Sequence, residues 1–148
     1  MVTEALQHVS RKKAEHKIIF QPSEDFILVK IDARLIMQVV INLVENAIKY
    51  TQRGSEIVIT TRRTEKDAVV RIADNGPGIP DESKEAVFDM FYSGAKSISD
   101  SRRSLGLGLS LCKSIITAHG GEITVTDNVP KGAVFTFTLP IEEVDLHE

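Results

Sequence analysis

The chain has 148 residues, of which 42% are hydrophobic, and this is enough to build the core of one ordinary domain. Its formal net charge of −3 is not the basic excess that nucleic-acid-binding proteins usually carry, so we expect no nucleic-acid partner. It contains no apolar run long enough to cross a bilayer and no signal peptide. The single cysteine, Cys112, cannot form an internal disulfide, so we expect a cytoplasmic domain in which it is a small buried hydrophobe.

The first fifty residues predict two helices with two strands between them. Residues 2–14 have a short amphipathic pattern, and the apolar alternation in 16–20 and 26–31 is typical of strands. Asp32 is a good N-cap for a long helix that ends near Tyr50.

This long helix carries the most informative pattern in the chain. Its apolar face is predicted to consist of Ile36, Val40, Leu43 and Ala47. Asn42, Asn46 and Lys49 fall on the opposite face at helical spacing. Amide oxygens are hard ligands that suit Mg²⁺, and a lysine can neutralise phosphate oxygens, so this face suits a metal-bridged polyphosphate. For this helix taken alone, a solvated polar face explains the pattern equally well.

A second motif follows two predicted strands, 56–63 and 68–73. It is the sequence D-N-G-P-G-I-P, which begins at Asp74. Glycine permits positive φ and close approach of a ligand to the backbone, and a carboxylate only accepts hydrogen bonds. Asp74 would therefore select a ring with an exocyclic amino group, which adenine has and which guanine replaces by a carbonyl oxygen at that position. A tight turn capped by its own Asp and Asn is the commoner explanation of such a motif in isolation.

The remaining elements end in a third motif. After the turn we expect a helix over 81–90, a second helix over about 108–119 that ends at Gly120 and Gly121, and strands over 122–126 and 133–139. Residues 92–105 are polar and without periodicity, so we expect a mobile loop there. Gly106 and Gly108 open the last helix, where free N–H groups and the helix dipole favour an anion, and Arg102 and Arg103 precede it. A flexible connection would look similar, but the order of the three motifs favours one nucleotide site.

In that order and spacing, the motifs resemble the ATP-binding catalytic domain of sensor histidine kinases, in the superfamily shared with gyrase, Hsp90 and MutL. The resemblance covers residues from about 16 to 140, and the early run from 16 to 32 is similar to potassium-responsive, Kdp-type sensor kinases. It implies a Bergerat-type fold, an α+β two-layer sandwich whose mixed sheet has about five strands and about three helices on one face. The interleaved helices and the short turns between strands independently favour such a mixed sheet.

The resemblance also implies roles for single residues. Asn42 and Asn46 would hold Mg²⁺ and, with Glu45 and Lys49, form the catalytic group, Lys49 contacting phosphate. Tyr50 would pack near adenine and Asp74 would bind its amino group. Further nucleotide contacts are expected from Gly76, Gly78, Ile79, Arg102, Arg103, Gly106, Leu107, Gly108 and Leu109.

Two positions depart from the family pattern. Ser104 and Leu105 stand where the family usually has a glycine and a small hydroxyl residue, which affects how the lid closes over the γ-phosphate. Val134 stands where a threonine usually precedes the strand phenylalanine, so an adenine-side hydrogen bond would be missing and affinity lower by roughly 1 kcal/mol.

The implied function is γ-phosphoryl transfer from Mg-ATP to a histidine on a dimerisation domain, and from there to a response regulator. None of the four histidines of this chain has the acceptor's sequence context. We therefore expect a linker-helix remnant in 1–14, the catalytic domain in 15–141 and an acidic tail in 142–148. This piece should be a monomer that cannot phosphorylate itself, whereas the parent should be a homodimer for which membrane anchoring is conceivable.

Three alternatives stay open. An ATPase module of the gyrase or Hsp90 type would need a glutamate base where this chain has Asn42, and Glu45 is less well aimed at the γ-phosphate. A stand-alone anti-sigma-type serine kinase shares all three motifs. A degenerate nucleotide sensor would account for the unusual lid sequence.

Overall fold

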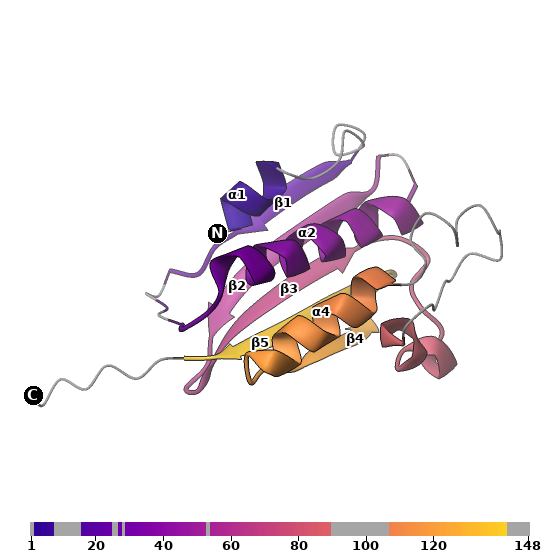
Figure 1. Cartoon of the computed structure of the whole chain (residues 1–148). Helices are drawn as coiled ribbons and strands as arrows, with labels where there is room; N and C mark the ends of the chain where they lie inside the picture. Colours follow the sequence, from indigo (N-terminus) through magenta and orange to yellow (C-terminus); the bar gives the residue numbers. More distant parts are fainter. Residues whose placement is uncertain are drawn as a thin grey trace, which may run out of the picture.

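A mixed five-stranded sheet with helices on one face forms the domain (Figure 1). The computed structural model describes residues 2–7, 16–24, 27, 29–52, 54–89 and 107–141. The strands, in their order across the sheet, are β1 (Lys17–Gln21), β2 (Glu56–Arg63), β3 (Asp67–Asp74), β5 (Ala133–Pro140) and β4 (Ile123–Asp127). β1 is parallel to β2, and all other neighbouring pairs are antiparallel. The predicted mixed sheet is therefore confirmed.

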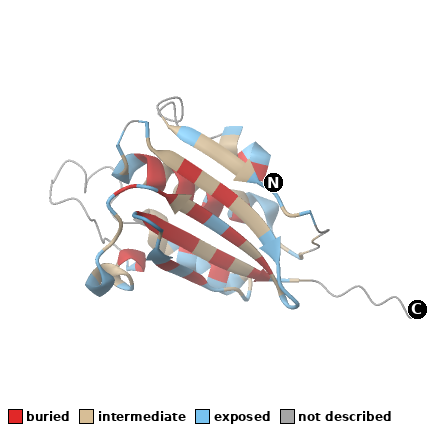
Figure 2. Ribbon diagram, turned by 180° about the vertical axis from the view of Figure 1, so that it is seen from behind, coloured by how far each residue is buried: buried red, intermediate tan, exposed pale blue. Residues whose placement is uncertain are grey.

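Three α-helices of the described residues cover the same face of this sheet: α1 (Val2–Gln7), α2 (Ala33–Tyr50) and α4 (Leu107–Ala118). α2 lies between the other two in Figure 1, with α1 on the β1 side. No helix of the described part of the chain lies on the opposite face of the sheet, and in Figure 2 its strands alternate between buried and more accessible residues. This is the pattern expected of a sheet with one face on the core and one towards solvent.

α2 begins as its sequence predicts. The Asp32 carboxylate accepts hydrogen bonds from the backbone N–H groups of Arg34 (3.0 Å) and Leu35 (3.3 Å), so it caps the first turn. The predicted apolar face is buried, and the complete set of buried α2 residues is Ile36, Val39, Val40, Leu43, Val44, Ala47 and Ile48. Each such aliphatic side chain contributes about 1.5–3 kcal/mol when fully buried, so packing against the sheet holds this helix.

α4 runs antiparallel to α2, because its C-terminal end lies at the start of α2. The His119 Nε2 accepts from the Asp32 N–H (3.1 Å), so its Nδ1 carries the proton and donates to the Ile115 carbonyl (2.7 Å). Gly120 follows with φ +78°, and the Gly121 N–H returns to the Ile116 carbonyl (3.0 Å). The predicted glycine C-cap is confirmed.

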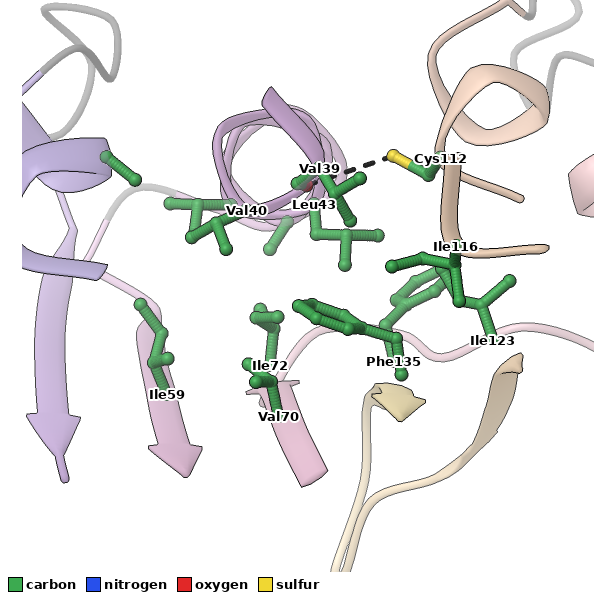
Figure 3. Close-up of a cluster of buried hydrophobic side chains, with 14 of the residues drawn as sticks. Val39, Val40, Leu43, Ile59, Val70, Ile72, Cys112, Ile116, Ile123 and Phe135 are labelled. Atoms are coloured by element: carbon green, nitrogen blue, oxygen red, sulfur yellow. Dashed lines mark hydrogen bonds between the residues drawn. The ribbon is translucent and has the colours of Figure 1, made fainter. Parts of the chain in front are cut away.

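The core lies between α2, α4 and the sheet (Figure 3). The labelled side chains point towards one another from all three elements: Val39, Val40, Leu43, Ile59, Val70, Ile72, Cys112, Ile116, Ile123 and Phe135. Cys112 is fully buried and its thiol lies 3.8 Å from the Val39 carbonyl oxygen. Burial raises the pKa of this thiol to about 12, against a smaller opposite effect of a hydrogen bond with Asn42. The prediction of a small buried hydrophobe is confirmed.

Two predicted elements are wrong. Of the strand expected over 26–31, the described residues 27 and 29–31 show one isolated bridge, between Val29 and Ile141. Their apolar alternation reflects packing against the core, with no backbone pairing among these described residues beyond that single bridge. The helix expected over 81–90 consists instead of two 3₁₀ turns, η2 (Asp81–Ser83) and η3 (Ala86–Phe88). This stretch has no apolar stripe at helical spacing, so packing cannot hold a longer α-helix.

Some predictions fall on residues outside the described ranges. They are the helical continuation over 8–14, the loop over 92–105 and the tail over 142–148. Within the described part of the chain, no helix is long and apolar enough to cross a membrane.

Candidate functional site

The polar face of α2 points away from the sheet. Asn42, Glu45 and Asn46 are half-buried there, and Lys49 is exposed near the helix end. The Asn42 Oδ1 accepts a hydrogen bond from the Gln38 side chain (2.7 Å). This bond, whose net stabilisation is of order 1 kcal/mol, uses one of the two lone pairs of that oxygen and leaves the other for a metal ion. The amide oxygens of Asn42 and Asn46 remain the hard ligands that this helix offers.

The end of α2 carries a cation–aromatic pair. The Lys49 Nζ lies 5.2 Å from the centroid of the Tyr50 ring, and Tyr50 is 38% exposed. Such contacts at exposed sites are worth about 0.5–1 kcal/mol, so a phosphate can compete for the ammonium. The exposed aromatic face of Tyr50 is available to a flat heterocycle.

Asp74, at the end of β3, is the one buried charged residue among those described, with 7% of its surface exposed. Its Oδ1 accepts from the backbone N–H groups of Gly76 (2.9 Å) and Ala133 (3.2 Å). Two such bonds offset part of the cost of removing a carboxylate from water. No described residue donates to Oδ2, which leaves that oxygen as an acceptor for a ligand.

The glycine turn after Asp74 packs directly against the C-terminal end of α2. A Cβ on Gly76 would lie 2.7 Å from the Thr51 Cγ2 and 3.5 Å from the Tyr50 carbonyl oxygen. The first and second motifs therefore meet in space, with the aspartate beside Tyr50 and the end of the amide-bearing helix. Gly78 has φ +79°, and Ile79 packs against the core from the same turn.

The structure also agrees in part with the alternative that this motif is a tight turn capped by its own Asp and Asn. Asp74 does cap the Gly76 N–H, and the Asn75 Oδ1 accepts from the Glu56 N–H (2.9 Å). Gly76 and Gly78 are thus required by the packing of the turn itself, whatever binds there. The free Oδ2 of Asp74 is the feature that a mere turn does not explain.

The third motif is described only from α4 onward. Leu107 begins the helix, Gly108 has open space where a Cβ would stand, and Leu109 packs partly against the core. In Figure 1 the start of α4 lies on the same side of the molecule as the end of α2. Other predicted residues lie outside the described ranges: Arg102, Arg103, Ser104, Leu105 and Gly106.

Binding of Mg²⁺ would require both the amide oxygens of α2 and the phosphates of the nucleotide. Among the described residues, no group of three or more His, Cys, Asp or Glu side chains could hold a metal ion. Asn42 and Asn46 supply neutral oxygens, so the negative charge that balances Mg²⁺ would come from the phosphates, as is usual for this ion.

The family comparison decides the identity of the fold. A model described as histidine kinase-, DNA gyrase B-, and HSP90-like ATPase matches residues 31–143, which include all three motifs. The chain belongs to this ATPase family.

Sensor kinases are among the relatives of this domain within the ATPase family. The domain is 44% identical over 142 residues to the sensor protein KdpD of Clostridium acetobutylicum, covering 96% of this chain and 16% of that protein. It is 42% identical over 127 residues to the adaptive-response sensory kinase SasA of Crocosphaera subtropica, covering 84% of this chain and 32% of that protein. The ATPase-family domain thus spans less than a third of these relatives.

Solved structures agree with this placement. The catalytic domain of the histidine kinase ThkA in a nucleotide-free form is 35% identical, with a TM-score of 0.79, and the match covers 94% of this chain and 90% of that one. The mycobacterial sensor histidine kinase MprB has a TM-score of 0.80 at 23% identity, with coverage of 97% and 93%, and shares the fold. This ATPase-family domain is therefore a histidine kinase catalytic domain with the expected Bergerat-type architecture.

Sequence reasoning missed the residues that support Asp74 from the β4–β5 turn. The Ala133 N–H and the Asn128 side chain both bind Asp74 in the ATPase-family domain. The run N-V-P-K-G over 128–132 was recognisable as a turn, but its position beside Asp74 depends on strand pairing. Val134, the predicted departure, is buried in β5 beside Ala133, and its effect on affinity stays a prediction.

Proposed function

We propose that this domain binds Mg-ATP between the polar end of α2 and Asp74, and presents the γ-phosphate to a histidine of the parent's dimerisation domain. The observation that carries the proposal is the contact of the Asp74 turn with the end of α2, at Gly76 and Thr51. In this proposal, Asp74 is the buried acceptor for the base. It faces the same site as the phosphate- and metal-binding groups of α2.

Each group then has a defined task. The free Oδ2 of Asp74 accepts from the exocyclic amino group of adenine, and Tyr50 lies against the ring. Lys49 exchanges its contact with Tyr50 for a phosphate oxygen, and the N–H groups at the start of α4 add positive potential. Magnesium, held by the amide oxygens of Asn42 and Asn46, would neutralise charge on the phosphates. Glu45, Ile79, Leu107, Gly108 and Leu109 remain proposed members of the site, as do Arg102, Arg103 and Gly106.

Catalysis in this proposal comes from positioning and charge neutralisation. Phosphoryl transfer needs little covalent help from the enzyme when donor and acceptor are aligned. The nucleophile is an imidazole nitrogen of the partner domain, and a response regulator then receives the phosphoryl group. Asn42 cannot act as a base, which favours transfer over hydrolysis of ATP.

Calorimetric titration with a non-hydrolysable ATP analogue and Mg²⁺ tests the site. We expect wild-type binding and a loss of at least about tenfold in Asp74→Asn, since the amide would turn a donor towards the amino group of adenine. Asp67→Asn is the matched control, because Asp67 is a half-buried carboxylate at the opposite end of β3. Absence of binding by the wild type, or equal affinities of the two variants, would refute the proposal.

A further inference from the structure

Two turns pack backbone to backbone beside Asp74. One is the glycine turn that follows β3, and the other joins β4 to β5 and ends at Gly132. Gly132 has φ +110°, and a Cβ there would lie 1.9 Å from the Asp74 carbonyl oxygen. A Cβ on Gly78 would lie 3.1 Å from the Gly132 carbonyl oxygen. The β4–β5 turn is thus in direct contact with the residue proposed to recognise adenine.

The side-chain amide of Asn128 makes one hydrogen bond to Asp74 and one within its own turn. Its Nδ2 donates to the Asp74 carbonyl (2.7 Å), while its Oδ1 accepts from the Val129 N–H (2.9 Å). Its backbone N–H donates to the Gly132 carbonyl (2.9 Å), which closes the turn. Asn128 is half-buried, and 54 residues separate it from Asp74 in the sequence.

The same turn also holds the Asp74 carboxylate. The Ala133 N–H directly follows the turn and shares Oδ1 with the Gly76 N–H. With Oδ1 occupied from two directions, the orientation of Oδ2 is determined by where the turn places the Ala133 N–H. Hydrogen bonds weaken steeply when distance and angle depart from their optimum, so a small shift of the turn changes what Oδ2 can bind.

We propose that Asn128 is a positioning residue for purine selectivity: its bond to the Asp74 carbonyl holds the β4–β5 turn so that Oδ2 faces the 6-amino group. This inference rests on the proposed function, because it assigns Asp74 the role of base recognition. Asn128 itself does not touch the nucleotide.

The test measures how much the 6-amino group contributes to binding. ATP is compared with purine riboside triphosphate, which lacks this group, by competition against a fluorescent adenine nucleotide in the presence of Mg²⁺. In the wild type we expect ATP to bind about tenfold more tightly, the value of one good hydrogen bond to a charged acceptor. In Asn128→Ala this ratio should fall to about two or less, mainly through weaker ATP binding.

Two further variants separate positioning from stability. Asn128→Asp keeps the acceptor for the Val129 N–H but replaces the donor to the Asp74 carbonyl by a charged acceptor, so the preference for ATP should also be lost. Thr138→Val removes the bond of the Thr138 hydroxyl to the Glu122 N–H (3.1 Å), at the far end of the same pair of strands. We expect it to lower the thermal midpoint comparably while keeping the wild-type ratio.

The outcomes distinguish this inference from the proposed function. If both Asn128 variants keep the wild-type ratio while Asp74→Asn loses it, Asn128 is only structural and the inference is wrong. If Thr138→Val lowers the ratio as much as Asn128→Ala, the effect is a general loss of stability and the inference is equally wrong. Failure of the wild type to bind ATP, or an unchanged ratio in Asp74→Asn, would instead refute the proposed function.

Discussion

At the scale of single residues, the two carboxylate oxygens of Asp74 have different surroundings, one suited to a structural role and the other to the proposed binding role. One carboxylate oxygen holds two backbone N–H groups, and the other receives none from the described residues. Hydrogen bonds to a charged acceptor contribute about 1.5–3 kcal/mol each, so the two existing bonds already account for much of the stabilisation of a buried charge. The oxygen that no described residue contacts is the one that we propose accepts a donor from the ligand.

Cys112 shows the opposite case, a reactive group that the fold makes inert. It is fully buried between α4 and α2, and burial raises its pKa to about 12. Only the thiolate reacts with thiol reagents, so we expect labelling of the folded domain at pH 8 to be at least about a hundredfold slower than labelling in denaturant. Mass spectrometry over time measures both rates. Rapid labelling of the folded domain, with its secondary structure intact by circular dichroism, would contradict this burial.

At the scale of elements, Lys84 holds the segment after the glycine turn through its polar contacts. The Lys84 Nζ donates to the Ile79 carbonyl (3.1 Å), contacts Asp127 of β4 (2.9 Å) and pairs with Asp81. It therefore ties η2 and the glycine turn to the end of β4. The pKa of Asp81 is lowered, first by its hydrogen bond with Lys84 and then by the charge of Lys84. The pKa of Lys84 is raised, chiefly by its hydrogen bonds to Asp81 and Asp127.

These shifts predict a pH window for the contribution of Lys84 to stability. A lowered Asp81 pKa stabilises the folded state above about pH 4, and this is lost as the pH falls through the lowered value. A raised Lys84 pKa stabilises the folded state below about pH 10, and this is lost as the pH rises through the raised value. Lys84→Met should therefore be less stable than wild type between these limits, with a smaller difference outside them.

Urea unfolding at several pH values measures this difference. Lys113→Met is the control, because the Lys113 Nζ lies over the Phe88 ring at 6.0 Å and has no carboxylate partner among the described residues. Its difference from wild type should not depend on pH in the acidic range. A Lys84→Met difference that stays constant from pH 3 to pH 8 would show that the ion pairs contribute nothing.

Elements also differ in how well local sequence predicted them. α2 has a side-chain cap at Asp32 and an apolar stripe that ends with Ile48, and both features agree with the structure. The helix predicted over 81–90 has a proline before it and acidic residues in its first turn, which are typical helix-start signals, yet its described residues, 81–89, form 3₁₀ turns. The difference is packing, since tertiary contacts of an apolar face stabilise helices more than end signals do.

At the scale of the whole molecule, strand order assembles the site. β3 lies between β2 and β5, so its last residue, Asp74, meets the β4–β5 turn on one side. α2 crosses above the same strands and brings Tyr50 and Thr51 to the glycine turn. We propose that the acceptor histidine lies on a separate dimerisation domain of the parent, so we expect this domain by itself to hold ATP without consuming it.

Radiolabelled ATP provides the measurement at this scale. The isolated domain should release negligible phosphate and should not label itself, whereas an added dimerisation hairpin of the parent should become labelled. The label should be acid-labile, because it sits on a histidine nitrogen, and Asp74→Asn should abolish it. Steady release of phosphate by the domain alone would favour a gyrase- or Hsp90-like ATPase, and an acid-stable label on a partner protein would favour a serine kinase.

Features that depend on neighbouring residues could be predicted from the amino-acid sequence: the cap and apolar face of α2, the glycine end of α4 and the three motifs with their order. These follow from local geometry, since helical spacing and turn chemistry act within a few residues. The folded structure was needed to show that the described part of the apolar stretch after β1 forms one bridge and no strand, and that Asn128 and Ala133 bind Asp74. The two contacts with Asp74 join segments more than fifty residues apart, and in each of them one partner is a backbone group, which nearly every residue possesses, so the sequence pattern does not record them.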